Sequence, residues 1–250
     1  MAAFLKEIQS AEMDPGSHFY KNKGDKHMRG MILNLFVTAA EAVTNTLNWA
    51  LLYLSLYPEV QDKLGNEILN VIGSDRSPSL GDLEKMPYTK SVMQEVLRIS
   101  STSPFSNFQM TTEDVTFETY FIPKGTTIIA NLYGIHHDPN LYPEPEIFNP
   151  DRFLDETRSP NAPPFLPFSV GLRTCLGQTF ARNEFFLLLV SLCQKFQFSW
   201  DPNVEKPTMD GLTEKCVSIF RFTPEFRLLL GWRSEMRGRR GEEHKIILPV

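Results

Sequence analysis

The chain has 250 residues, of which 42% are hydrophobic and 22% are charged, and its formal net charge is −5. This composition indicates a globular protein with one sizeable core, and the acidic charge gives no support to a nucleic-acid partner. The three cysteines, Cys175, Cys193 and Cys216, are too few for a disulfide framework and lack the spacing of a zinc site. They indicate a reducing compartment.

The N-terminal part of the chain is expected to form a short amphipathic helix over residues 3–13, which ends at Asp14-Pro15-Gly16. A charged link over residues 21–29 follows. A signal peptide is not expected, because charged residues follow directly on the first apolar ones, and we expect no membrane anchor before the fold. Residues 1–30 are therefore assigned to a leading helix and a charged link.

The longest predicted element covers residues 31–57, which hold no glycine or proline and one charged side chain, that of Glu41. Its length fits a helix that spans a membrane. The polar side chains along it instead favour a helix buried in a large core, and they are Asn34, Thr38, Thr44, Asn45, Thr46 and Asn48. Pro58 ends this helix and opens the next one, over about residues 59–72, which stops at Gly73.

A further helix is predicted over residues 88–100, where Tyr88 and Val92 begin an apolar stripe. Glu95 and Arg98 lie three residues apart and share a face of this helix. Taken alone, the pair is typical of a solvated surface ion pair, which contributes little stability.

The middle of the chain is expected to hold short strands, near residues 115–117, 121–122 and 126–130. The proline-rich segment 136–167 is predicted to have little regular structure, and a loop of that length inside a compact domain is usually functional. We expect His136 and His137 to cap or pack in this loop rather than to bind a metal.

The C-terminal part begins with a predicted helix over about residues 178–196, which is apolar nearly all round and is therefore expected to be buried. Terminal strands are predicted over residues 196–200, 217–222 and 226–230. The tail, residues 233–250, is rich in charge and is expected to be disordered. Together these elements predict a mainly α fold with small β-sheets, in the α+β class.

The most informative segment is a loop in which Phe168, Gly171, Arg173, Cys175 and Gly177 precede a long helix. A cysteine just before a helix start lies near the positive end of the helix dipole, which favours the thiolate. The two glycines allow a tight turn and the close approach of a flat group, and an arginine can hydrogen-bond a carboxylate. A thiolate, a close approach and a carboxylate clamp are together what a haem requires on its proximal side.

These residues match the pattern Phe-x-x-Gly-x-Arg-x-Cys-x-Gly, and in this the chain resembles the cytochrome P450 family. Glu95-x-x-Arg98 and the segment 148–153 precede the loop in the order and spacing typical of that family. Other segments that look like the family are residues 120–126, 136–139 and 181–185, and residues 3–7 and 86–88 look like its microsomal family 2 enzymes. The resemblance covers about residues 3–230.

The resemblance implies that residues 31–232 form a P450-like haem-binding core, which corresponds to the C-terminal half of such an enzyme. The cofactor would be haem b, with Cys175 as the axial ligand of the iron, and the remaining haem-binding residues would be Phe168, Gly171, Arg173 and Gly177. A buried ion network behind the haem would consist of Glu95, Arg98 and Arg152. Gln109 stands where the microsomal enzymes often have a histidine or arginine near a haem propionate.

The oxygen-activation motif of the family, Ala/Gly-Gly-x-Asp/Glu-Thr, aligns with residues 38–42. Glu41 keeps the acid, but Ala42 stands in place of the threonine that hydrogen-bonds the iron-bound dioxygen in the family. Thr38 lies one turn earlier on the same face. Two interpretations stay open: Thr38 partly replaces the threonine, or its hydroxyl bonds back to its own helix.

The function implied by the resemblance is that of a haem-thiolate monooxygenase. It would oxidise a lipophilic small molecule with O2 and with electrons from NADPH, supplied by a flavoprotein reductase that docks on the Cys175 side. By resemblance its place is the cytosolic face of the endoplasmic reticulum membrane. The catalytic residues would be Glu41 and Thr38, and the residues that line the substrate site would be Phe36, Ala39, Ala42, Phe105, Ser106, Asn107, Phe108, Val217, Ser218 and Ile219.

Two alternatives follow from the departures of this sequence from the family. A P450-like isomerase or peroxide-rearranging enzyme dispenses with the threonine, because its substrate brings its own O–O bond. A truncated, non-catalytic isoform is the other alternative, since the membrane anchor, first strands and substrate-access helices of the family have no expected counterpart in the chain.

Overall fold

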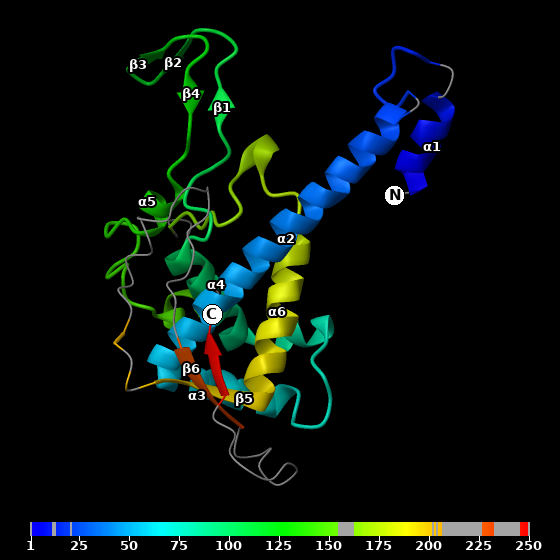
Figure 1. Ribbon diagram of the computed structural model, residues 1–250. Helices are drawn as coiled ribbons and strands as arrows, with labels where there is room; N and C mark the ends of the chain where they lie inside the picture. The colour runs from blue at the N-terminus through cyan, green and yellow to red at the C-terminus, as the bar shows by residue number, and fades with distance from the viewer. Residues whose placement is uncertain are drawn as a thin grey trace. The chain divides into compact units, whose positions relative to one another are not determined.

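The computed structural model of the chain describes residues 2–11, 14–20, 22–154, 163–201, 203, 205–206, 227–232 and 246–249. Helices dominate the described residues, and the strands form three small antiparallel sheets (Figure 1). This is the mainly α architecture with small sheets that the sequence predicts. The chain separates into two compact units, Met1–Val43 and Thr44–Val250. The division lies inside a helix rather than at residue 30.

The first unit holds α1 (Ala2–Ser10) and the beginning of α2 (Asn22–Leu56). A Cβ added to Gly24 would lie 2.6 Å from Cγ1 of Ile8, so the absence of a side chain at this position lets α1 approach α2 closely. The predicted charged link is wrong for residues 22–29, which are helical. Glycine disfavours a helix by about 1 kcal/mol, and here a tertiary contact accompanies the helical backbone.

The predicted burial of the long helix is confirmed only for its second part. From Val43 onward α2 contributes core residues, among them Trp49 and Leu52, which are fully buried. The preceding turns instead expose large apolar side chains, namely Met31, Ile32, Leu33, Leu35, Phe36 and Val37. An apolar helical pattern specifies a face to be covered but not the neighbour that covers it, which explains the difference. Among the described helices, none combines the length and the apolar character needed to span a membrane.

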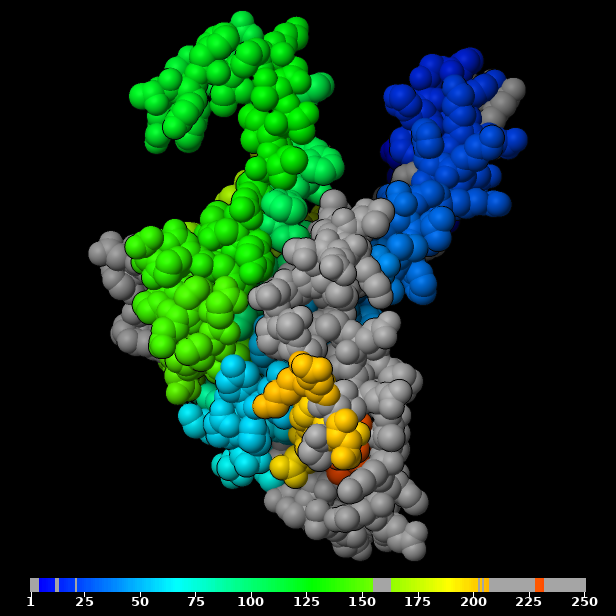
Figure 2. Space-filling model, turned by 60° about the vertical axis from the view of Figure 1, so that its left-hand side comes forward, coloured from blue at the N-terminus to red at the C-terminus, as the bar shows by residue number. Residues whose placement is uncertain are grey.

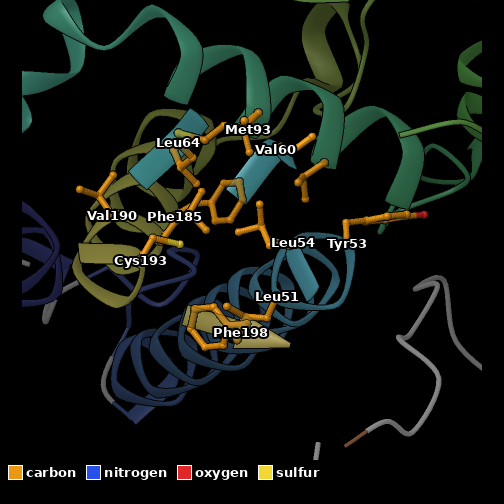
Figure 3. Close-up of a cluster of buried hydrophobic side chains, with 14 of the residues drawn as sticks. Leu51, Tyr53, Leu54, Val60, Leu64, Met93, Phe185, Val190, Cys193 and Phe198 are labelled. Carbon is orange, nitrogen blue, oxygen red and sulfur yellow. The ribbon is translucent and has the colours of Figure 1, made fainter. Parts of the chain in front are cut away.

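The core of the second unit is built where four helices and a sheet meet. The end of α2 packs with α3 (Pro58–Val71), α4 (Pro87–Ser100), α6 (Gln178–Lys195) and the sheet that contains β5. Figure 3 shows side chains from these elements converging on one cluster, including Leu54, Leu64, Met93, Phe185 and Phe198. This cluster positions α4 and α6, which carry the candidate site residues.

The helix α6 has the predicted bounds but not the predicted burial on all sides. Phe186 and Leu189 are fully buried, whereas Phe180 is 63% exposed and Leu188 is 39% exposed. Phe180 lies in the first turn, next to the cysteine loop. An apolar side chain exposed at that point is available to cover a ligand rather than the core.

The C-terminal sheet joins β5 (Phe196–Trp200), β6 (Arg227–Trp232) and β7 (Ile246–Pro249) in that order. The predicted disorder of the tail is wrong for residues 246–249, because β7 pairs with β6 from Arg227 opposite Pro249 to Leu230 opposite Ile246. Such pairing is a non-local contact that local charge composition does not reveal. The predicted strand 217–222 and the rest of the tail lie outside the described residues.

Two hairpin-like sheets extend from the helical part of the same unit as an arm, visible in green in both Figure 1 and Figure 2. One pairs β1 (Gln109–Met110) with β4 (Thr127–Ile128), and the other pairs β2 (Val115–Phe117) with β3 (Tyr120–Ile122). The strand β1 was not predicted, because two residues carry no detectable period. Short helical segments complete the unit: η2 (Leu80–Lys85), α5 (Leu132–His136), η3 (Pro150–Phe153) and η4 (Gly171–Arg173).

Two adjacent leucines of α6 should differ clearly in how much they contribute to the free energy of unfolding. Leu189→Ala should lower the free energy of unfolding by about 2–5 kcal/mol, because it removes a fully buried side chain and leaves a cavity. Leu188→Ala should cost under about 1 kcal/mol, because that side chain is partly in solvent. Urea denaturation followed by circular dichroism measures both. Equal costs would contradict the packing described.

Candidate functional site

The loop before α6 is closed by main-chain hydrogen bonds. The N–H of Cys175 donates to the carbonyl oxygen of Phe168 at 2.9 Å, and the hydroxyl of Thr174 donates to the same oxygen at 3.2 Å. Gly171 has a φ of +79°, in the left-handed region that favours glycine. The tight turn at Gly171 therefore brings Cys175 back beside Phe168, immediately before the helix.

The Cys175 thiol is exposed, and so are its apolar neighbours in the loop and in the first turn of α6. Val170 is 67% exposed, Leu176 is 93% exposed and Phe180 is 63% exposed. A Cβ added to Gly171 or Gly177 would meet nothing within 4 Å, so the backbone is open to close approach at both glycines. An exposed thiol thus lies in an open, apolar loop.

The other loop residues of the predicted set lie around this turn. Arg173 is exposed in η4, two residues before Cys175. Phe168 is partly buried, and the guanidinium carbon of Arg182 lies 5.1 Å from the centre of its ring. Arg182 belongs to α6, so this cation–π contact ties the loop to the helix that follows it.

The predicted ion network is formed, and its central pair is completely buried. Arg98 makes a two-pronged ion pair with Glu95: Nε donates to Oε2 and Nη2 to Oε1, both at 2.8 Å. Both side chains have no exposed area. The side chain of Arg152 joins them, with Nε donating to Glu95 Oε1 at 3.2 Å. The structure therefore brings all three residues together.

The remaining donors of the two arginines fasten the irregular loop that precedes the cysteine loop. Arg98 donates to the carbonyl oxygens of His136 and Pro145, each at 2.8 Å. Arg152 donates to the carbonyl oxygens of Pro143, Glu144 and Ile147. A buried pair stabilises a fold only where its remaining hydrogen-bonding capacity is satisfied, and here the loop backbone satisfies it.

His136 is buried beside this network, with 1% of its surface exposed. Its Nε2 accepts the N–H of Leu166 at 3.0 Å, and its Nδ1 lies 3.0 Å from the hydroxyl of Ser101. Burial, helped by the charges of His137 and Arg98, lowers the pKa of His136 to about 4. The expectation that His136 packs in the loop is thus confirmed, and in the described part of the chain no cluster of three metal-ligating side chains is found.

The residues predicted for oxygen activation lie in the first unit, whereas Cys175 lies in the second. The hydroxyl of Thr38 donates to the carbonyl oxygen of Asn34, one turn earlier, at 2.7 Å. This is the back-bonded arrangement, one of the two alternatives that the sequence left open. A shared site for Cys175 with Thr38, Glu41 and the predicted lining residues Phe36, Ala39 and Ala42 stays a prediction.

The second group of predicted lining residues, 105–108, contains three exposed side chains and one buried side chain. Phe105 is 44% exposed and Phe108 is 64% exposed, and Asn107 between them is also exposed. Ser106 is buried, and its Oγ accepts the N–H of Ala130 at 2.9 Å, so it joins two chain segments. Gln109 begins β1, opposite Ile128. The third group, Val217, Ser218 and Ile219, lies outside the described residues.

A family model described as cytochrome P450 matches residues 4–228. The chain belongs to the cytochrome P450 family. Human cytochrome P450 2J2 is 42% identical over 219 residues, which are 86% of this chain and 43% of that protein. Bovine cytochrome P450 2U1 is 43% identical over 182 residues, which are 72% of this chain and 33% of that protein.

A solved P450 shares the fold. The structure of a zebrafish cytochrome P450 with progesterone superposes with a TM-score of 0.65 at 34% sequence identity, covering 71% of this chain and 40% of the zebrafish protein. The chain therefore has a P450 fold, and it spans less than half the length of the P450 relatives it matches.

The residues at the cysteine loop fit a haem bound by one thiolate. A P450 haem takes a single axial side chain from the protein, a cysteine thiolate, and presents a broad apolar face. The loop offers one exposed thiol with exposed apolar side chains in the same segment, and two glycines open to close approach. Arg173 supplies a guanidinium suited to a carboxylate such as a propionate.

Two contacts in this P450 were not found from the sequence. Arg182 belongs to a segment that resembles the family, yet its contact with the Phe168 ring depends on how the loop folds back. The hydrogen bond from Leu166 to His136 joins residues 30 apart in the chain. No local sequence pattern predicts either contact. The pair of histidines before Asp138 marked the position of His136 but not its partner.

Removing one charge from the buried network should strongly lower the stability of the protein. Glu95→Gln should lower the free energy of unfolding by about 3–5 kcal/mol, because Arg98 keeps its buried charge without a partner. A matched control is Glu84→Gln, since the Glu84 side chain is 81% exposed in its pair with Lys90 and should contribute no more than about 1 kcal/mol. Urea denaturation compares the two. Similar costs would show that the network is not closed to solvent.

Because the ring of His136 is buried in its neutral form, we expect the stability of the protein to depend on pH between pH 6.5 and pH 4. The folded chain holds the neutral ring, whose pKa is lowered to about 4, whereas the unfolded chain takes up a proton near pH 6.5. Stability should therefore be complete above pH 6.5 and fall by up to roughly 3 kcal/mol as the pH drops towards 4. Guanidinium denaturation at each pH should give a steeper pH dependence for the unsubstituted protein than for His136→Gln. Parallel curves would contradict the buried neutral ring.

Proposed function

We propose that the chain is the haem-binding part of a haem-thiolate monooxygenase. The observation that carries the proposal is the exposed thiol of Cys175, held by main-chain hydrogen bonds in a loop that matches the P450 pattern. Membership of the family supports the same conclusion. A buried structural cysteine is the contrasting case in this chain, namely Cys193, which is fully enclosed in the core.

The chain's own residues have separate tasks in this proposal. Cys175 is the axial ligand, Arg173 holds a haem carboxylate, and Phe168 with the two loop glycines shapes the turn. When bound, a thiolate-ligated haem supplies the activation of dioxygen, which the electron-rich ligand favours. The network of Glu95, Arg98 and Arg152 keeps the loop before the cysteine in place through its backbone carbonyls.

The proposed substrate is a lipophilic small molecule, and the proposed electron donor is NADPH through a flavoprotein reductase. The solved zebrafish relative, described with progesterone, supports the class of substrate and not its identity. The similarity to human cytochrome P450 2J2 and bovine cytochrome P450 2U1 supports a place at the endoplasmic reticulum membrane. Glu41 would serve proton delivery in this reaction.

A second candidate function keeps the haem and changes the reaction. Ala42 has no hydroxyl, and the hydroxyl of Thr38 is engaged with the carbonyl oxygen of Asn34. These two facts favour a peroxide-rearranging or isomerase reaction, whose substrate carries its own O–O bond. A third candidate is a non-catalytic chain, which would keep the P450 fold without binding haem.

The central prediction concerns the reduced, carbon-monoxide-bound protein expressed with a haem supply. Its Soret band should show the strong red shift of thiolate ligation, and Cys175→Ala should abolish that band. Cys193→Ala is the matched control, because it removes a buried thiol and should leave the band in place. Folded protein without bound haem would overturn both enzymatic candidates and leave the non-catalytic chain.

If the band is present, turnover separates the two enzymatic candidates. Oxidation of a lipophilic probe only with NADPH and reductase supports the monooxygenase. Conversion of an organic hydroperoxide without NADPH supports the rearranging enzyme.

A further inference from the structure

His136 joins the ion network to the segment entering the cysteine loop, through its main-chain carbonyl on one side and its ring on the other. On one side, the carbonyl oxygen of His136 accepts a hydrogen bond from Nη1 of Arg98 at 2.8 Å. On the other side, its ring nitrogen Nε2 accepts the N–H of Leu166 at 3.0 Å. The residue is 1% exposed, so both bonds are formed away from solvent.

The hydrogen bonds around the ring specify its protonation. A main-chain N–H can only donate, so Nε2 must accept from Leu166 and carries no proton. In a neutral ring the proton then lies on Nδ1, which donates to the hydroxyl of Ser101. That hydroxyl in turn donates to the carbonyl oxygen of Arg98 at 2.8 Å. Every polar atom of the ring thus has one partner of the correct kind.

From Leu166 the bonds continue along the backbone to the cysteine. The carbonyl oxygen of Leu166 accepts the N–H of Ser169 at 3.1 Å, which begins the turn. The carbonyl oxygen of Phe168 then accepts the N–H of Cys175 at 2.9 Å. Hydrogen bonds, joined by short stretches of backbone, therefore lead from the buried Glu95–Arg98 pair through His136 to the residue that carries the thiol.

Two aromatic neighbours hold the same segment without replacing this bond. The ring of Phe165 lies 5.9 Å from the ring of His136, centre to centre. The hydroxyl of Tyr142 donates to the carbonyl oxygen of Pro164 at 3.2 Å. Neither contact satisfies the N–H of Leu166, which loses its acceptor if the imidazole is removed.

We propose that His136 is a positioning residue that fixes Leu166, and through it the cysteine loop, so that the Cys175 thiol is held ready to ligate. This inference rests on the proposed function for the identity of the ligated group. The role it assigns to His136, however, is a property of the loop and can be measured without haem.

The first test is hydrogen exchange of the loop in the protein as purified. Residues 163–168 have the sequence Pro-Pro-Phe-Leu-Pro-Phe, so only Phe165, Leu166 and Phe168 carry an amide hydrogen there. Their exchange should rise about tenfold or more in His136→Phe, because the Leu166 N–H loses its acceptor. In His136→Gln it should stay within about twofold of the unsubstituted protein, because the amide oxygen provides a new acceptor.

The matched control is His137→Phe, one residue along. The ring of His137 stacks on Tyr133 at 3.8 Å between centres, and a phenyl ring can keep that contact. This control should leave exchange in residues 163–168 unchanged. Unchanged exchange in His136→Phe, or the same increase in His136→Gln, would overturn the proposal, because packing alone would then account for the histidine.

The second test is the carbon-monoxide spectrum of the same variants. His136→Phe should lose most of the thiolate band, whereas His136→Gln should retain it. Thiolate ligation as complete in His136→Phe as in the unsubstituted protein would overturn the positioning role while leaving the proposed function intact. If the unsubstituted protein binds no haem, the proposed function fails, and the exchange experiment alone decides the role of His136.

Discussion

The pair of opposite charges formed by Glu95 and Arg98 is the constraint on which this arrangement depends. Moving two charges out of water costs several kcal/mol for each ion, and their mutual attraction offsets that cost only when the remaining donors and acceptors are satisfied. In this chain the main-chain carbonyls of His136 and Pro145 satisfy Arg98, and a donor of Arg152 and the N–H of Asn149 satisfy Glu95. Burial of the pair therefore requires the backbone between His136 and Pro145 to follow one particular path.

This dependence explains how residues 136–147, which are mostly irregular, are held in place. Backbone groups in such a segment have no ladder of partners of their own. Here Arg98 provides donors from α4, and Arg152, in η3 just after these residues, reaches the carbonyl oxygens of Pro143, Glu144 and Ile147. The arginine side chains thus satisfy backbone carbonyl groups that a neighbouring strand would satisfy in a sheet.

The sequence predicted α4 well because its apolar period is strong, and α6 because its apolar run is long and unbroken by proline. The resemblance to the family identified the three members of the ion network. Prediction from the sequence failed where a distant contact decides the outcome. Residues 22–29 are helical although their composition indicates a link, and Gly24 lies against Ile8 from another helix. The strand β7 exists only through its pairing with β6. The exposure of apolar side chains at the start of α2 could not be predicted either, because an apolar pattern does not show which element, if any, covers it.

The backbone of the cysteine loop is held largely by main-chain hydrogen bonds, so most of its exposed side chains can be substituted without breaking them. Three main-chain hydrogen bonds close the loop, from Ser169 to Leu166, from Thr174 to Gly171 and from Cys175 to Phe168, beside the one from the Thr174 hydroxyl. Bonds of this kind do not depend on which side chain stands between them. Val170, Leu172 and Leu176 project into solvent, so substitutions there change the apolar surface around the thiol without removing a hydrogen bond that closes the loop. The surface of the loop and its backbone can therefore change separately.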